Sequence, residues 1–122
     1  MACDTFTAAN LAALIAGHRY SYASESELQQ GIASVLATAG IEYQREGILS
    51  ARDRLDFMVG PIAIEVKIAD PRAAVLRQLH RYTQHPEVTA IILVTRKARH
   101  LDMPATLNGK SIHVASLLEG SF

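Results

Sequence analysis

Residues 54–68 read RLDFMVGPIAIEVKI, a segment that predicts two β-strands joined by a tight turn at Gly60 and Pro61. Side chains alternate between the two faces of a strand. One face should therefore hold the apolar residues Leu55, Phe57, Val59, Ile62, Ile64, Val66 and Ile68. The charged residues Asp56, Glu65 and Lys67 should lie on the opposite faces of the two strands.

A two-residue turn would place Asp56 directly opposite Glu65, with their Cβ atoms about 4.5–5.5 Å apart. Like charges at such a position are destabilising unless a cation lies between them, and a divalent metal ion would supply that charge. The alternative is a ladder of surface salt bridges, in which Arg54 pairs with Glu65 and Lys67 with Asp56. Proline at the second position suits few two-residue turns, so the connection could also be longer. A longer connection would shift the pairing of Asp56 with Glu65.

Composition indicates one globular domain over residues 1–122, since 49% of the residues are apolar and no low-complexity tract interrupts them. No apolar run approaches the ~20 residues of a membrane span, and no secretory signal is recognisable, so we expect a cytoplasmic protein. The single Cys3 excludes an internal disulfide and argues against a zinc site. The chain has 12 basic and 12 acidic side chains, so its formal net charge is zero and does not indicate a nucleic-acid partner.

The periodicity predicts an α/β fold with a mixed central sheet flanked by helices. Helices are expected from Thr7 to Ala16, from a Ser24 cap to about Ala39, and from an Asp70 cap to about Gln84. Strands are expected at about 42–50, 54–59, 62–68, 89–95 and 111–115, the last at an edge of the sheet. The apolar strand 89–95 should lie parallel to 62–68 after a right-handed crossover.

Two helices carry polar residues on the sides that should face the sheet. Glu25 lies on the apolar side of its helix and Glu27 on the opposite side, so Glu25 is either a first-turn charge or part of a buried polar site. Gln78 and Tyr82 are four residues apart and therefore neighbours on one side of the third helix. That helix begins directly after the strand that carries Glu65, and its free amides could attract a phosphate.

The order of these elements and residues resembles the PD-(D/E)XK nuclease superfamily, including small RecB-like, resolvase-like and VRR-NUC-like members. The matching residues are Glu25, Asp56 and the Glu65-Val66-Lys67 tripeptide, followed by a Gln78-x-x-x-Tyr82 helix motif. Leu55 stands where many members have proline. The resemblance covers about residues 24–95 and implies a restriction-endonuclease-like αβββαβ core, preceded here by an extra N-terminal helix.

The resemblance implies a metal-dependent endo- or exodeoxyribonuclease that uses Mg²⁺ or Mn²⁺. Asp56, Glu65 and the Val66 backbone carbonyl would bind the metal, and Glu25 would hold a second metal or a water. Lys67 would orient the attacking water, help to deprotonate it and stabilise the developing charge. Gln78 and Tyr82 would position the site or the substrate backbone.

Basic side chains outside this group could contact nucleic-acid phosphates, namely Arg54, Arg77, Arg81, Arg96 and Lys97. We expect DNA as the partner, with a homodimer, the shape of the DNA or a partner protein supplying specificity because the chain is small. Two alternatives stay open: a catalytically inactive nucleic-acid-binding accessory protein with the same fold, and a protein-interaction domain whose charges form salt bridges. No Gly-rich phosphate loop or Gly-x-Ser-x-Gly motif points to nucleotide-dependent or serine-hydrolase chemistry.

Overall fold

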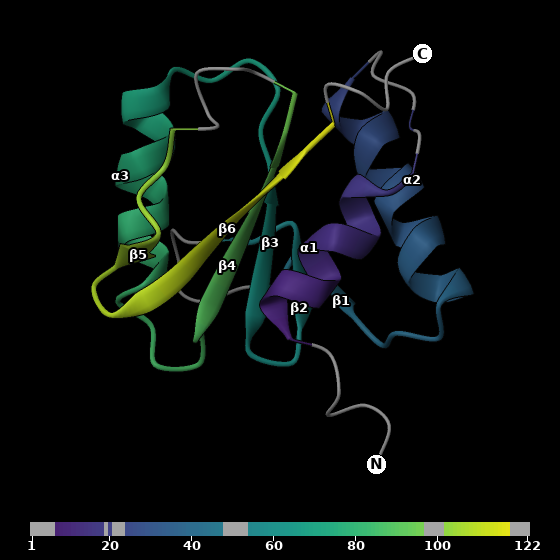
Figure 1. Ribbon diagram of the computed structural model, residues 1–122, viewed down its shortest axis with the longest axis horizontal. Coiled ribbons are helices and arrows are strands. Elements are labelled where there is room, and N and C mark those ends of the chain that lie inside the picture. Colours follow the sequence, from purple (N-terminus) through teal and green to yellow (C-terminus); the bar gives the residue numbers. More distant parts are fainter. Residues whose placement is uncertain (1–6, 19, 21–23, 48–53, 97–101, 118–122) are drawn as a thin grey trace.

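A mixed β-sheet separates two helices from a third (Figure 1). The computed structural model describes residues 7–18, 20, 24–47, 54–96 and 102–117. The helices in this part of the chain are α1 (Ala8–Ala16), α2 (Glu25–Thr38) and α3 (Arg72–Tyr82). The strands are β1 (Gln44–Arg45), β2 (Phe57–Val59), β3 (Ile62–Val66), β4 (Ala90–Thr95), β5 (Thr106–Leu107) and β6 (Lys110–Ser116).

The strand order across the sheet is β1-β2-β3-β4-β6-β5. β3, β4 and β6 run parallel, and the remaining neighbours are antiparallel. β3 and β4 are parallel and are connected through α3, as predicted, and all six residues of β4 are buried as the apolar run indicated. Figure 1 shows α1 and α2 on one side of the sheet and α3 on the other. The expected α/β class, with a mixed sheet between helices, is confirmed.

The hairpin between β2 and β3 has the predicted register, with Phe57 opposite Ile64 and Val59 opposite Ile62. Gly60 has a φ of 55°, the left-handed backbone that a type II′ turn needs at its first central position. The φ of about −65° that proline imposes suits the second central position of that turn. The two-residue turn therefore accommodates Pro61, and no longer connection shifts the strands.

Two apolar clusters cover the two faces of the sheet. The cluster under α1 and α2 contains most of the predicted apolar face, namely Phe57, Ile62, Ile64, Val66 and Ile68. Leu55 instead packs under α3 with Ala63, Val75, Leu79 and Tyr82, so its assignment to the Phe57 face is wrong. The chain bends at Asp56, and strict alternation between faces does not extend through a bend.

The first two helices start at their predicted caps, where the side chains of Thr7 and Ser24 accept hydrogen bonds of 3.1 Å from backbone amides three residues on. The predicted Asp70 cap of α3 is wrong. Pro71 holds the cap position without a side-chain hydrogen bond, and the Asp70 carboxylate lies 3.8 Å from the Lys67 ammonium instead. In the described part of the chain, no helix has the length and apolarity needed to cross a membrane.

The C-terminal strand is not the edge strand that the sequence predicted. β6 lies between β4 and the short β5, to which it is joined by a turn at Asn108 and Gly109. Both turn residues have positive φ values, of 54° and 80°, as a type I′ hairpin turn requires. β1 is also shorter than the predicted strand 42–50, although residues 48–50 lie outside the described residues.

Candidate active site

Asp56 and Glu65 lie side by side because each is one residue farther from the turn than the paired residues Phe57 and Ile64. The Asp56 backbone N–H donates a hydrogen bond of 3.1 Å to Oε1 of Glu65. In return, Oδ2 of Asp56 accepts a hydrogen bond of 2.7 Å from the backbone N–H of Val66. The Glu65 residue is only 2% exposed. The hairpin therefore brings two carboxylates together, as predicted, and fixes each through the backbone of the other strand.

Tyr82 and Gln78 connect α3 to this pair. The Tyr82 hydroxyl lies 3.1 Å from Oε2 of Glu65 and 3.0 Å from the backbone carbonyl oxygen of Arg54, so these two acceptors share its proton. The side-chain amide of Gln78 donates a hydrogen bond of 2.8 Å to the Tyr82 oxygen. Gln78 and Tyr82 therefore contact each other, as their four-residue spacing indicated, and Tyr82 links them to Glu65.

Glu25 reaches the same region from the first turn of α2. Its Oε2 accepts a hydrogen bond of 3.1 Å from the backbone N–H of Ile68, just beyond the end of β3. Glu25 is half-buried, whereas Glu27 is exposed, as helical geometry predicted. We call Glu25, Asp56 and Glu65 the carboxylate cluster.

In the described residues, Lys67 is the cation that forms an ion pair with Glu65, with Nζ 3.7 Å from Oε2. It also lies 3.8 Å from Oδ2 of Asp70, and only 14% of its side chain is exposed. The surface salt-bridge ladder does not form in the described residues, because Glu65 is buried and Lys67 pairs with Glu65 and Asp70 rather than with Asp56. One half-buried ammonium therefore pairs with two carboxylates.

The carboxylate cluster has perturbed pKa values. Burial raises the pKa of Glu65 to about 8, and the Asp56 charge adds to the rise. Burial also raises the pKa of Asp56, against the lowering effects of the Val66 N–H and the Lys67 charge; the Glu25 charge raises it further. Without a bound cation, burial and the Asp56 charge therefore favour the protonated form of Glu65.

The carboxylate cluster suits Mg²⁺ in ligand type, since this ion takes oxygen ligands. Within the described part of the chain, Oδ1 of Asp56 and Oε1 of Glu25 carry no hydrogen bond. Both oxygens of Glu65 are engaged. Consistent with this, the described residues contain no group of three or more His, Cys, Asp or Glu side chains already placed to hold a metal ion. Metal binding would require Glu65 to lose its proton and exchange a contact.

The basic residues predicted to contact phosphates do not form one group. Arg54 is exposed beside the Tyr82 hydrogen bond, whereas Arg77 and Arg81 lie on α3. Arg96 directly follows β4, at the same end of the sheet as Lys67, because the Lys67 N–H donates to the Val94 carbonyl. Lys97 lies outside the described residues.

Sequence reasoning missed Arg45, which pairs with Phe57 across β1 and β2. Its guanidinium carbon lies 5.0 Å from the centroid of the Phe57 ring, and its charge lowers the pKa of Asp56. The sequence did indicate that some side chain lies opposite Phe57, because a strand that pairs with residues 57–59 must place one there. Only the register of β1 could show which side chain that is.

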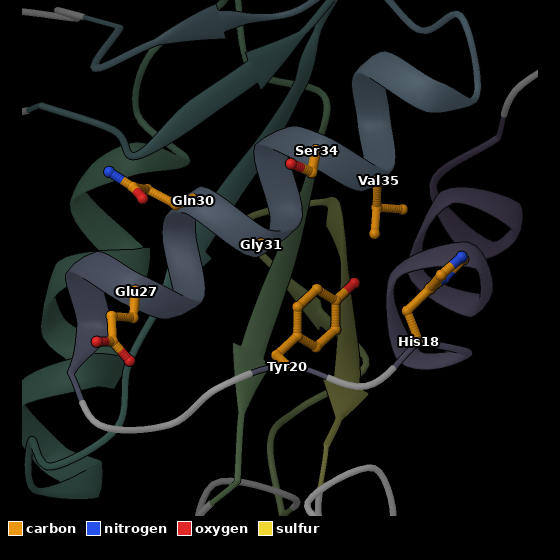
Figure 2. Close-up of a pocket in the computed structure, with 7 residues that line it drawn as sticks. All are labelled: His18, Tyr20, Glu27, Gln30, Gly31, Ser34 and Val35. Carbon is orange, nitrogen blue, oxygen red and sulfur yellow. The ribbon is translucent and has the colours of Figure 1, made fainter.

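An open pocket of about 610 Å³ lies elsewhere, between α2 and the end of α1 (Figure 2). Its lining includes His18, Tyr20, Glu27 and Gly31 but no member of the carboxylate cluster. The Tyr20 ring lies over Gly31, and its hydroxyl donates a hydrogen bond of 2.8 Å to the Ile15 carbonyl. Close packing of an aromatic ring on the helix backbone explains the glycine.

Replacing Gly31 with alanine is expected to lower the free energy of unfolding by about 1 kcal/mol. The new Cβ would lie 2.6 Å from Cδ1 of Tyr20, and overpacking of about 1–3 kcal/mol should exceed the ~1 kcal/mol gain in helix propensity. Urea denaturation would measure the change. With Tyr20 also replaced by alanine, the same substitution should be stabilising, and equal effects in both backgrounds would contradict this explanation.

The residues around the hairpin thus combine oxygen ligands, an ammonium group and a hydrogen-bonded tyrosine, a set suited to the hydrolysis of a phosphate ester. Glu25, Asp56, Glu65, Lys67, Gln78 and Tyr82 are all linked to this region by the contacts described above. No protein-family model matches the sequence, and no curated protein or solved structure matches the chain.

Proposed function

We propose that this chain is a metal-dependent nuclease that hydrolyses phosphodiester bonds in DNA. One observation supports this most strongly: Asp56 and Glu65 face each other across a hairpin, with the Lys67 ammonium 3.7 Å from Glu65. Such a pair with a buried Glu65 adds little to stability, because burial and the Asp56 charge raise the pKa of Glu65 and its ionised form destabilises the fold. The arrangement is better explained by a bound cation.

The order of elements supports the same proposal. In the described residues, α2, β1, β2, β3, α3 and β4 follow one another in the αβββαβ order of the restriction-endonuclease-like core, and α1 precedes them. The resemblance of the sequence to the PD-(D/E)XK superfamily assigns the carboxylates to the second and third strands of that core. Asp56 immediately precedes β2 and Glu65 lies in β3.

Asp56, Glu65 and the Val66 carbonyl would hold Mg²⁺ or Mn²⁺, with Glu25 as a further ligand. The N–H and C=O of one strand residue point to the same side, and the Val66 N–H donates to Asp56. The Val66 carbonyl therefore also faces the Asp56 side. When bound, the ion would neutralise charge on the phosphate and lower the pKa of the attacking water.

The protein side chains have separate roles in this proposal. Lys67 orients the water and stabilises the charge that develops on the phosphate. Tyr82, supported by Gln78, holds Oε2 of Glu65 in place. Glu25 ties the start of α2 to the end of β3 through the Ile68 amide. Among the residues predicted to contact phosphates, Arg54 lies beside Tyr82 and Arg96 lies at the Lys67 end of the sheet, so both could meet phosphates near the site.

Asp56→Ala is expected to remove both metal binding and cleavage. In the wild type, Mg²⁺ or Mn²⁺ at 100 times its Kd should stabilise the fold by about 2.7 kcal/mol, which a thermal shift measures. Cleavage of single-stranded, duplex, flap and junction DNA, and of RNA, should be tested with the same protein. The variant should show no metal-dependent shift and at least ~10³-fold slower cleavage, since the ion supplies several kcal/mol of stabilisation.

Glu27→Gln is the matched control, because this exposed carboxylate lies on the same helix turn as Glu25 and points away from the cluster. It should retain both the shift and the cleavage. The engagement of both Glu65 oxygens favours a second candidate, an inactive nucleic-acid-binding accessory protein. Nucleic-acid binding by the wild type without a metal-dependent shift or cleavage would favour that candidate and contradict the nuclease.

A further inference from the structure

Arg45 is an exposed arginine held in a defined position on β1, next to the strand that Asp56 precedes. It lies on β1 directly opposite Phe57, and Phe57 is the neighbour of Asp56 in the chain. The guanidinium carbon is 5.0 Å from the centroid of the Phe57 ring, within the range of a cation–π contact. Nη2 donates a hydrogen bond of 3.2 Å to Oε1 of Gln29 on α2.

The platform under Arg45 is rigid. Phe57 is fully buried, and Tyr43 packs against it edge to face, with ring centroids 5.6 Å apart and an interplanar angle of 64°. An arginine that stacks on such a ring and is tethered by Gln29 has already lost much of its rotamer freedom. Its donors are therefore preorganised for a ligand.

Arg45 has donors left over. The guanidinium carries five N–H groups, and in the described part of the chain one hydrogen bond, to Gln29, uses them. Arg45 also forms no ion pair with a carboxylate of the described residues. An exposed, stacked guanidinium with unused donors, on the strand next to the one that Asp56 precedes, is suited to bind a phosphate through two parallel hydrogen bonds.

We infer that Arg45 binds a phosphate of the substrate strand next to the one that is cleaved. This inference rests on the proposed nuclease function and narrows the substrate to a polynucleotide with successive phosphates. Because Arg45 stands to one side of the carboxylate cluster, it contributes to substrate binding rather than to the chemical step. The nucleic-acid strand that is cut therefore runs from the carboxylate cluster toward β1 and the Gln29 side of α2.

Arg45→Gln tests the inference through the division of its effect between KM and kcat. We expect KM for a DNA oligonucleotide to rise about 10–100-fold, the effect of losing charged hydrogen bonds, with kcat within about twofold of wild type. The slope of log affinity against log salt should fall by about 1, as for one lost phosphate contact. Arg45→Lys, which keeps the charge but not the stacked fork, should lie between the two proteins.

Lys110→Gln is the matched control. It removes one positive charge on β6, near the edge of the sheet opposite to β1, where Nζ of Lys110 donates to the His85 carbonyl oxygen. It should leave KM and the salt slope nearly unchanged. A fall in kcat without a rise in KM in Arg45→Gln would overturn the inference, since Arg45 would then act through the carboxylate cluster. Unchanged KM and kcat would also overturn it.

A separate measurement keeps this result distinct from the nuclease proposal itself. Fluorescence anisotropy with the same labelled oligonucleotide reports binding whether or not the wild type cleaves it. If the wild type cleaves nothing, the nuclease proposal fails, and Arg45 is tested by affinity alone. A 10–100-fold weaker Kd in Arg45→Gln would then support the phosphate contact, and an unchanged Kd would overturn it.

Discussion

Replacing Lys67 with alanine is expected to slow DNA cleavage by about 10²–10⁴-fold while the Mg²⁺-dependent rise in Tm persists. The ammonium lies 3.7 Å from Glu65 and is largely shielded from water, so it can act on a water or phosphate at the carboxylate cluster. Removing it leaves all the oxygen ligands in place. Single-turnover cleavage and a thermal shift with metal would measure the two effects separately.

Asp70→Asn provides the control for Lys67. This carboxylate lies 3.8 Å from the ammonium, and 43% of its side chain is exposed, so the pair contributes at most about 1 kcal/mol. The control should change the cleavage rate by less than about fivefold. Full cleavage by Lys67→Ala would remove Lys67 from the mechanism. Loss of the metal-dependent shift together with cleavage would show that Lys67 is needed for metal binding rather than for the chemical step alone.

The hairpin shows which features can be read from the sequence. Alternating apolar residues on both sides of Gly60-Pro61 allow one register that buries Phe57 opposite Ile64, and a slip of one residue would expose that face. The meeting of Asp56 and Glu65 follows directly from this register. Glu25 was equally predictable, because the apolar stripe of α2 orients the helix.

Other features depend on contacts that a local pattern does not contain. Asp70 was predicted as a helix cap, but the nearby Lys67 ammonium competes for its carboxylate. Leu55 left its predicted face because the chain bends at Asp56. β5 has two residues, too few for any periodicity, and without it β6 looked like an edge strand.

The same distinction applies to the candidate active site. The residue types at Asp56, Glu65, Lys67, Gln78 and Tyr82 were evident, yet three of their contacts run through backbone groups. These are the Asp56 and Val66 amides and the Arg54 carbonyl. Backbone positions follow from the assembled sheet, so side-chain identity could not reveal them. Arg45 was missed for the same reason.

Glu65→Gln is expected to make the metal-free protein more stable than wild type at pH 8 and nearly equal to it at pH 5. In the wild type, burial raises the pKa of Glu65 from 4.5 to about 8. The folded state therefore holds a proton that the unfolded chain releases near pH 4.5. The stability from this group is complete below pH 4.5 and is lost as the pH rises toward 8.

The size of this effect follows from linkage. Each pH unit between the two pKa values lowers the free energy of unfolding by up to about 1.4 kcal/mol, so the loss by pH 8 is on the order of a few kcal/mol. Glutamine stays neutral, can still accept from the Asp56 amide and can donate to the Tyr82 oxygen. Urea denaturation in EDTA at pH 5, 6, 7 and 8 would measure both proteins. Parallel profiles for wild type and variant would contradict the raised pKa of Glu65.

Adding Mg²⁺ to the same series separates a structural role of Glu65 from a functional one. A metal ion competes with the proton for this carboxylate, so its stabilisation of the wild type should grow from pH 5 to pH 8 and be largely absent in Glu65→Gln. A purely structural glutamate would gain nothing from the metal at any pH. If the glutamine variant is more stable without metal but can neither bind metal nor cleave DNA, then the ionised carboxylate destabilises the fold. Its place in β3 would then be explained by catalysis, since active sites commonly retain groups that destabilise the fold.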